Sequence, residues 1–230
     1  MNFHIITLFP ESLDSYINSS IIGRAIRDKK IRVKFYNPRD FTKDKHRRVD
    51  QRPFGGGPGM VLEAESVVRA VEKALPHPKS LSLQRRGILK NILIIWLSPN
   101  GKQFDNNYAE KVAKKIKDVV IICGRYEGID ARVKKIIKDL YKIKVEDLSI
   151  GPYVLTGGEL PAMIIIDTIA RRIPGVLGKI ESVEENRVSS REVYTRPEIL
   201  TYKGKKYKVP KVLVSGHHKK IEEWKIKKNL

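Results

Sequence analysis

The sequence predicts an α/β fold with an open, mostly parallel β-sheet, followed by a small, basic and mainly helical domain at the carboxyl end. Short apolar runs typical of buried strands alternate with longer amphipathic runs between residues 92 and 148. Such alternation is typical of right-handed βαβ units. Three glycine-bearing turns also come directly after apolar strands, which predicts one ligand site at the carboxyl edge of the sheet.

The first half of the chain predicts two strands and three helices. Residues 3–9 are mostly apolar and indicate a buried strand, and the proline at position 10 suits the first turn of a helix. Periodicity predicts a helix over residues 23–30, a half-exposed strand over 31–36 and a helix over 63–75. Residues 37–59, the basic loop, show no periodicity, and a loop of that length is more often functional than idle.

The second half continues the alternation. Residues 92–97 are fully apolar and predict a strand, as expected for a parallel sheet covered on both faces. The apolar run at residues 119–123 and the β-type run around Ile143 and Val145, within residues 142–148, predict two more strands. Helical spacing covers residues 104–117 and 129–138. Residues 159–173 are apolar nearly all round, so that helix is expected to be buried inside the fold or against a partner subunit.

Composition and charge divide the chain into three parts. We expect a main α/β domain over residues 1–173, a polar linker over 174–196 and a small basic domain over 197–230. The net charge of +20 and the isoelectric point of about 10.0 favour a polyanionic partner, with nucleic acid as the first candidate. A proteome rich in lysine is the alternative explanation for the positive charge, but it does not account for the arginines in the middle of the chain. The single cysteine, Cys123, and the absence of a signal peptide or membrane-spanning run predict a cytoplasmic protein.

The basic loop concentrates groups that can bind phosphate and bases. Its cationic and glycine positions include Arg39, His46, Arg47, Arg48, Arg52, Gly55, Gly56 and Gly57. Guanidinium groups match phosphate geometry, and glycines let backbone amides approach a ligand. A solvated charged loop is the alternative, but the concentration of arginine favours RNA contact. No Gly-Lys-Ser/Thr follows the glycines, which excludes a P-loop.

Three side chains could carry a proton: His46, Asp50 and Glu127. A lone acid in a basic loop is more often an ion-pair partner, whereas Glu127 precedes a glycine at a strand end and is the better candidate. His217 and His218 lack acidic or cysteine companions at ligand spacing, so no metal site is predicted there.

Several short motifs lie in a fixed order along the chain. They are Leu8-Phe9-Pro10-Glu11, Pro38-Arg39-Asp40-Phe41, His46-Arg47 with Val49-Asp50, Arg52-Pro53-Phe54 leading into residues 55–60, Leu97-Ser98-Pro99, residues 123–130, residues 149–161, residues 173–178 and Tyr194-Thr195-Arg196-Pro197-Glu198. With this set the chain resembles the bacterial tRNA (guanine-N1)-methyltransferase family of the SPOUT superfamily. The resemblance implies a deep trefoil knot, which neither composition nor periodicity would reveal.

The resemblance also implies that S-adenosylmethionine is the cofactor, held mainly by backbone groups of the three strand-end turns. The matching positions are Leu97, Ser98, Pro99, Gly124, Ile150, Gly151, Pro152, Tyr153, Val154, Leu155, Gly157 and Gly158. Pro152 departs from the family, which usually has aspartate there. Mg²⁺ stays open as a second cofactor, and Glu127 matches a residue linked to cofactor or magnesium handling.

The substrate implied by the resemblance is tRNA, methylated at N1 of the guanosine that follows the anticodon. The RNA-contacting positions are then those of the basic loop, including Asp50, together with Arg196. The family works as a homodimer in which both subunits build each site. Arg171 matches the arginine that stabilises guanine O6, and the apolar helix at residues 160–169 would lie at the subunit contact.

The expected general base departs from the family. The family aspartate falls on Asn186, and an amide cannot accept a proton at neutral pH. Three explanations stay open: Glu185 or Glu184 is a displaced base, the protein is an impaired relative that still binds tRNA, or Asn186 is an introduced change. An RNA-binding protein without chemistry and a SPOUT methyltransferase acting on ribosomal RNA are the alternative functions.

Overall fold

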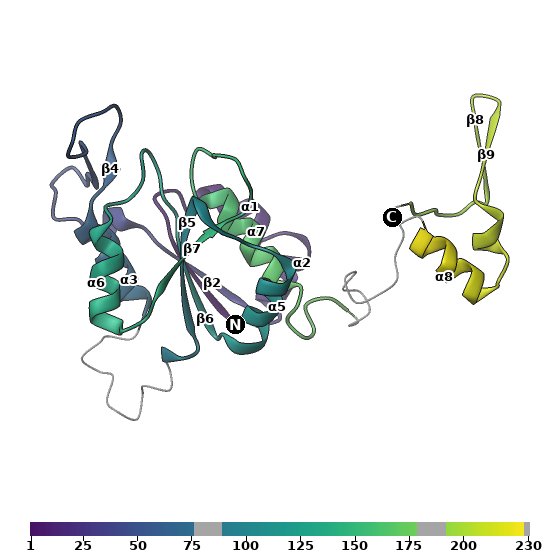
Figure 1. Ribbon diagram of the computed structural model, residues 1–230, viewed down its shortest axis with the longest axis horizontal. Helices are drawn as coiled ribbons and strands as arrows, with labels where there is room; N and C mark the ends of the chain where they lie inside the picture. Colours follow the sequence, from purple (N-terminus) through teal and green to yellow (C-terminus); the bar gives the residue numbers. More distant parts are fainter. Residues whose placement is uncertain (76–88, 179–191, 228–230) are drawn as a thin grey trace. The chain divides into compact units, whose positions relative to one another are not determined.

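The computed structural model describes residues 1–75, 89–178 and 192–227. The chain divides into two compact units, Met1–Leu177 and Gly178–Leu230. The first unit holds a parallel sheet with its helices, and the second holds a hairpin and a helix (Figure 1). None of the described helices has the length and apolar character that crossing a membrane requires.

The first unit is built on a five-stranded sheet in which all neighbouring strands are parallel. Its strands are β1 (Asn2–Ile6), β2 (Arg32–Tyr36), β5 (Ile92–Gln103), β6 (Asp118–Ile122) and β7 (Val145–Ser149). The spatial order is β2-β1-β6-β5-β7. This sheet confirms the predicted α/β class, and it brings the carboxyl ends of β6, β5 and β7 to one edge.

Helices cover both faces of the sheet (Figure 1). They are α1 (Glu11–Ile17), α2 (Ser20–Arg27), α3 (Ala64–Ala74), α5 (Asn106–Lys115), α6 (Arg132–Tyr141) and α7 (Glu159–Ala170). Successive strand side chains point to opposite faces, so Ile5 packs with α1, α2, α5 and α7, and Ile6 packs with α3 and α6. Because both faces are covered, β6 and the first half of β5 are apolar at nearly every position.

The basic loop contains more regular structure than the sequence predicted. A short 3₁₀ helix, η1 (Pro38–Asp40), follows β2, and β3 (Asp50–Gln51) pairs antiparallel with β4 (Val61–Leu62) just after the loop. The sequence predicted that the helix following β6 starts at residue 129. Ile129 instead forms a β-bridge with Leu62, and α6 starts at Arg132. Two-residue strands are too short to leave a period-two pattern.

Strand β5 extends beyond the predicted strand over residues 92–97. Its register with β7 shifts in the middle, because Leu97 and Lys102 both pair with Leu148. The predicted turn at residues 98–101 is therefore a bulge within the strand. Glycine is required at position 101, since a Cβ there would lie 2.6 Å from the backbone of Leu148.

The second unit combines a β-hairpin with helical segments. Strands β8 (Ile199–Tyr202) and β9 (Lys205–Lys208) are antiparallel, and η6 (Lys211–Val214) and α8 (His218–Lys227) follow them. The linking residues Lys203 and Gly204 have φ angles of 48° and 76°, which is typical of a type I′ turn. The prediction of a mainly helical domain missed this hairpin.

One buried hydroxyl in the core offers a test of stability. Tyr141 is 1% exposed, and no described residue forms a hydrogen bond with its hydroxyl. Burial raises the pKa of Tyr141 from 10.0 to about 12. The unfolded chain therefore loses this proton at lower pH than the folded protein does, and stability falls as pH rises from 10 to 12.

Tyr141→Phe is expected to increase the free energy of unfolding by about 1 kcal/mol near pH 7, because it removes a buried polar group without a partner. The variant should also lose less stability than the wild-type protein above pH 10. Urea unfolding of both proteins at neutral and alkaline pH measures the two effects. A variant that is less stable at pH 7 would show that the hydroxyl contributes favourably.

Candidate functional site

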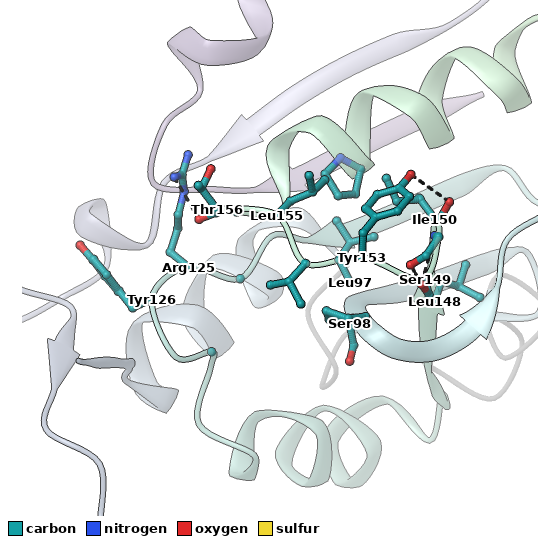
Figure 2. A pocket seen from close by; sticks show the side chains of 18 of the residues that line it. Leu97, Ser98, Arg125, Tyr126, Leu148, Ser149, Ile150, Tyr153, Leu155 and Thr156 are labelled. Carbon is teal, nitrogen blue, oxygen red and sulfur yellow. Dashed lines mark hydrogen bonds between the residues drawn. The ribbon is translucent and has the colours of Figure 1, made fainter. Parts of the chain in front are cut away.

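A pocket of about 300 Å³ opens at the carboxyl edge of the sheet (Figure 2). The β5 bulge, the turn after β6 and the loop between β7 and α7 line it. The lining residues are Leu97, Ser98, Pro99, Gly124, Arg125, Tyr126, Glu127, Gly128, Leu148, Ser149, Ile150, Gly151, Tyr153, Val154, Leu155, Thr156, Gly157, Gly158 and Pro161. Every position expected to hold the cofactor lies along this pocket except Pro152.

Two glycines allow the walls of the pocket to come together. The N–H of Gly158 donates to the carbonyl oxygen of Gly124 at 3.0 Å, and Gly157 forms a β-bridge with Arg125. A Cβ at position 158 would lie 2.6 Å from Cα of Cys123. Helix α7 can therefore begin this close to the end of β6 only because position 158 has no side chain.

An ion pair between a half-buried arginine and a buried glutamate supports the same wall. Nη2 of Arg125 lies 3.0 Å from Oε2 of Glu159, and the Thr7 hydroxyl donates to Oε1 of this carboxylate at 2.7 Å. The Arg125 guanidinium lies 4.5 Å from the centre of the Phe9 ring. Burial and, to a lesser degree, the Glu159 carboxylate raise the pKa of the Cys123 thiol well above its usual range, so the thiol stays protonated and unreactive.

Acidic side chains hold the basic loop in shape. Arg48 donates through two nitrogens to the Asp44 carboxylate at 2.9 to 3.2 Å, and these hydrogen bonds hold the pKa of Asp44 well below its usual range. Arg47 also pairs with an acid, donating through Nη2 to Oδ1 of Asp40. The exposed residues of the loop include His46, Arg47, Arg48, Arg52, Gly55, Gly56 and Gly57, while Arg39 and Asp50 are half-buried. The loop thus presents an ordered cationic surface.

The chain just after the basic loop is hydrogen-bonded to the pocket. The N–H of Glu127 donates to the carbonyl oxygen of Met60, and the N–H of Leu62 donates to that of Gly128, both at 3.0 Å. The Glu127 carboxylate also covers Gly59, where a Cβ would lie 2.5 Å from Oε1. Glu127 therefore lies at the boundary between the pocket and the loop.

Comparison with known proteins connects this geometry to a family. The family model described as tRNA (guanine-1)-methyltransferase TrmD matches residues 1–230. The chain belongs to this family. A protein named tRNA (guanine-N(1)-)-methyltransferase from Buchnera aphidicola is 44% identical over 99% of this chain and 89% of its own length. One of the same name from Clostridioides difficile is 42% identical over 98% of this chain and 90% of its own length.

Within this member of the tRNA (guanine-1)-methyltransferase family, Glu127 lines the pocket but Arg171 does not. Arg171 follows the carboxyl end of α7, whose amino end forms the pocket wall. A helix of 12 residues is about 18 Å long. Arg171 and the pocket of the same chain are therefore separated by the length of the helix.

The remaining predicted site residues fall elsewhere in this methyltransferase. Asn186 and Glu185 lie outside the described residues. Arg196 belongs to the second unit, where a cis peptide bond joins it to Pro197.

The sequence prediction did not name Arg125, which lines the pocket, or Thr7 and Glu159, which support it from behind. Arg125 and Glu159 lie inside the recognised motifs, but they are far apart along the chain. One signal was available: Glu159 begins an otherwise apolar helix, and a buried carboxylate requires a partner.

Proposed function

We propose that this protein transfers the methyl group of S-adenosylmethionine to N1 of the guanosine 3′-adjacent to the anticodon in tRNA. The pocket at the ends of β5, β6 and β7 carries the proposal, because the positions expected to hold the cofactor lie along it. The family match over the whole chain supports the reaction and its substrate. The exposed arginines of the basic loop supply a surface for phosphates. A cytoplasmic location is part of this proposal.

The pocket suits a ligand that contains adenosine. Leu97, Ile150 and Leu155 offer apolar contacts, and the glycine-bearing turns place backbone polar groups along the walls. A volume of about 300 Å³ falls at the lower end of the range for small-molecule sites. S-adenosylmethionine, when bound, supplies an electrophilic methyl group, and the residues of this chain hold and orient it.

Methylation of guanine N1 requires removal of the N1 proton and charge relief at O6. We assign the charge relief to Arg171, whose guanidinium can donate to O6. Glu185 is assigned as the general base that removes the N1 proton, because Asn186 stands at the position of the family aspartate and cannot accept it. Glu127, at the boundary between the pocket and the basic loop, is assigned to positioning the cofactor.

We further propose a homodimer in which Arg171 of one subunit serves the pocket of the other. The exposed side of α7 carries Leu160 and Ile164, which are 55% and 44% exposed, and a groove beside them is lined also by Tyr16 and Leu155. Contiguous apolar exposure of this kind is typical of a protein interface. A two-fold axis near the middle of α7 would bring the carboxyl end of each helix to the partner's pocket.

The proposal includes the deep trefoil knot of the SPOUT superfamily, formed by the segment from β5 to α7. Its support is the contact of residues 157–158 with residues 124–125, which places the start of α7 against the turn after β6. The two segments are distant in sequence, and glycine at positions 157 and 158 permits their approach.

Magnesium is not assigned a site of its own. Among the described residues, no group of three or more His, Cys, Asp or Glu could hold a metal ion. Mg²⁺ is usually bound by one or two carboxylates together with water and oxygens of a substrate, and at this pocket Glu127 would supply one such carboxylate.

If Glu185 is the general base, two substitutions should have opposite effects on methyl transfer. Glu185→Gln is expected to lower methyl transfer about 10²-fold or more, because a neutral amide cannot take the N1 proton. Asn186→Asp should be at least as active as the wild-type protein. Incorporation of labelled methyl groups into bulk tRNA and ribosomal RNA, followed by nuclease digestion and mass spectrometry, measures the product.

Each outcome of that assay selects one function. Full activity of Glu185→Gln would discard the displaced base. Binding of tRNA without transfer, with activity gained in Asn186→Asp, would identify an impaired relative. Preferential methylation of ribosomal RNA would contradict the proposed substrate.

A further inference from the structure

The wall of the pocket contains a cation balanced by a buried anion. Arg125 is one of the residues that line the pocket, and its side chain is 24% exposed, while the Glu159 side chain is 4% exposed. Their Nη2 and Oε2 atoms lie 3.0 Å apart. The other charged residue among those lining the pocket is Glu127, which is exposed at the boundary with the basic loop. Arg125 therefore brings positive charge to the wall itself, and Glu159 compensates it.

Neighbouring groups fix this pair in place. The Thr7 hydroxyl donates to Oε1 of Glu159 at 2.7 Å, and Nη1 of Arg125 donates to the carbonyl oxygen of Thr156 at 3.3 Å. Gly157 leaves room for the pair, because a Cβ there would lie 2.5 Å from Nε of Arg125 and 2.6 Å from Oε2 of Glu159 and would displace these side chains. Nε of Arg125 and Oε2 of Glu159 are buried, and neither forms a hydrogen bond with a described residue, so the two side chains are joined by charge at 3.0 Å and not by a hydrogen bond. The geometry thus leaves Glu159 as the described anion that balances the guanidinium.

Stability alone does not explain a buried pair of this kind. Desolvation of the two charges offsets much of their attraction, and apolar residues of similar volume often stabilise a protein equally well. A role connected with the charge of the pocket is therefore the better explanation.

The ligands expected in this pocket differ in charge. S-adenosylmethionine carries one positive charge more than S-adenosylhomocysteine, which remains after the methyl group has left. A guanidinium in the wall without a balancing anion would repel the sulfonium. It would therefore raise the free energy of bound S-adenosylmethionine relative to that of bound S-adenosylhomocysteine. The same guanidinium would leave the product comparatively unaffected.

We propose that Glu159 is a specificity-determining residue, which neutralises Arg125 so that the pocket accepts the sulfonium cofactor and does not favour the demethylated product. Arg125 can then hold the Thr156 carbonyl in the wall without repelling the cofactor. This inference rests on the proposed function, because it takes S-adenosylmethionine as the ligand.

The test is the ratio of the dissociation constants for S-adenosylmethionine and S-adenosylhomocysteine, measured by calorimetry at pH 8. Glu159→Gln keeps the size of the side chain and an oxygen that can accept from Thr7, but it leaves Arg125 unbalanced. The ratio is expected to rise about ten-fold. Arg125→Gln leaves the carboxylate unbalanced and should lower the ratio, and the double variant should return it close to the wild-type value.

Damage to the fold would weaken both ligands alike, so an unchanged ratio in both single variants would overturn the proposal. Glu146→Gln is a matched control, since Glu146 accepts a hydrogen bond from Tyr108 at 2.8 Å and does not line this pocket. Its ratio should equal that of the wild-type protein. If Glu159→Gln does not fold, the opposite shift in Arg125→Gln decides the question. Failure of the unmodified protein to bind either ligand would instead contradict the proposed function.

Discussion

Replacement of Arg171 by alanine is expected to lower the rate of methyl transfer about 10²–10³-fold while the affinity for S-adenosylmethionine stays unchanged. The guanidinium is assigned to the charge that develops on guanine O6, and it lies at the end of α7 opposite to its own chain's pocket. Single-turnover rates with tRNA and calorimetric titration measure the two quantities. Arg172→Ala is the matched control, because Arg172 donates to the backbone oxygen of Thr168 within the helix.

A mixing experiment shows which chain's pocket Arg171 serves. Ser98 lines the pocket, so Ser98→Trp is expected to block the cofactor and remove activity. Random pairing of Arg171→Ala chains with Ser98→Trp chains makes about half of the dimers hybrid, each with one intact shared site, so activity should return to about a quarter of wild type. No recovery after mixing would mean that each chain builds its own site.

Gly158→Ala is expected to destabilise the protein by about 1–3 kcal/mol and to weaken binding of S-adenosylmethionine about ten-fold or more. The added Cβ would lie 2.6 Å from Cα and 2.8 Å from Cβ of Cys123. Since the first of these atoms belongs to the backbone, the start of α7 would have to move. That movement would break the hydrogen bond to Gly124 and displace the loop that lines the pocket.

Gly178→Ala separates this effect from the general cost of replacing a glycine. Among the residues that the structure describes, no atom lies within 4 Å of the position that its Cβ would occupy, and its backbone is not left-handed. Denaturant unfolding and cofactor titration of both variants provide the comparison. If the two variants lost the same stability and the same affinity for the cofactor, the close approach of α7 to the end of β6 would not require glycine at position 158.

The strands of the parallel sheet could be predicted because burial on both faces leaves a local pattern. Residues 92–97 and 119–123 are apolar throughout, and the structure places strands on both. The hairpin of β8 and β9 left no such pattern, because all of its strand residues are exposed. Its signal was the Lys203-Gly204 pair, whose positive φ angles close the turn.

The pocket could be located from the sequence because glycine-bearing turns after apolar strands carry a local signature. The pairing of Arg125 with Glu159 could not, since it depends on two distant segments meeting across Gly157. The position of Arg171 at the far end of an apolar helix was predictable. Which pocket Arg171 would complete in the proposed homodimer depends on assembly, and assembly is not encoded in any local pattern.

The two hydrogen bonds that join Met60 and Leu62 to the turn after β6 have a thermodynamic consequence. The chain that leaves the basic loop is hydrogen-bonded directly to the turn that lines the pocket, so a shift of either would be transmitted through main-chain atoms. Reciprocity then applies: the factor by which tRNA changes the affinity for the cofactor equals the factor by which the cofactor changes the affinity for tRNA. The order of arrival can alter the rates of assembly, but the free energy of the ternary complex is the same by either route.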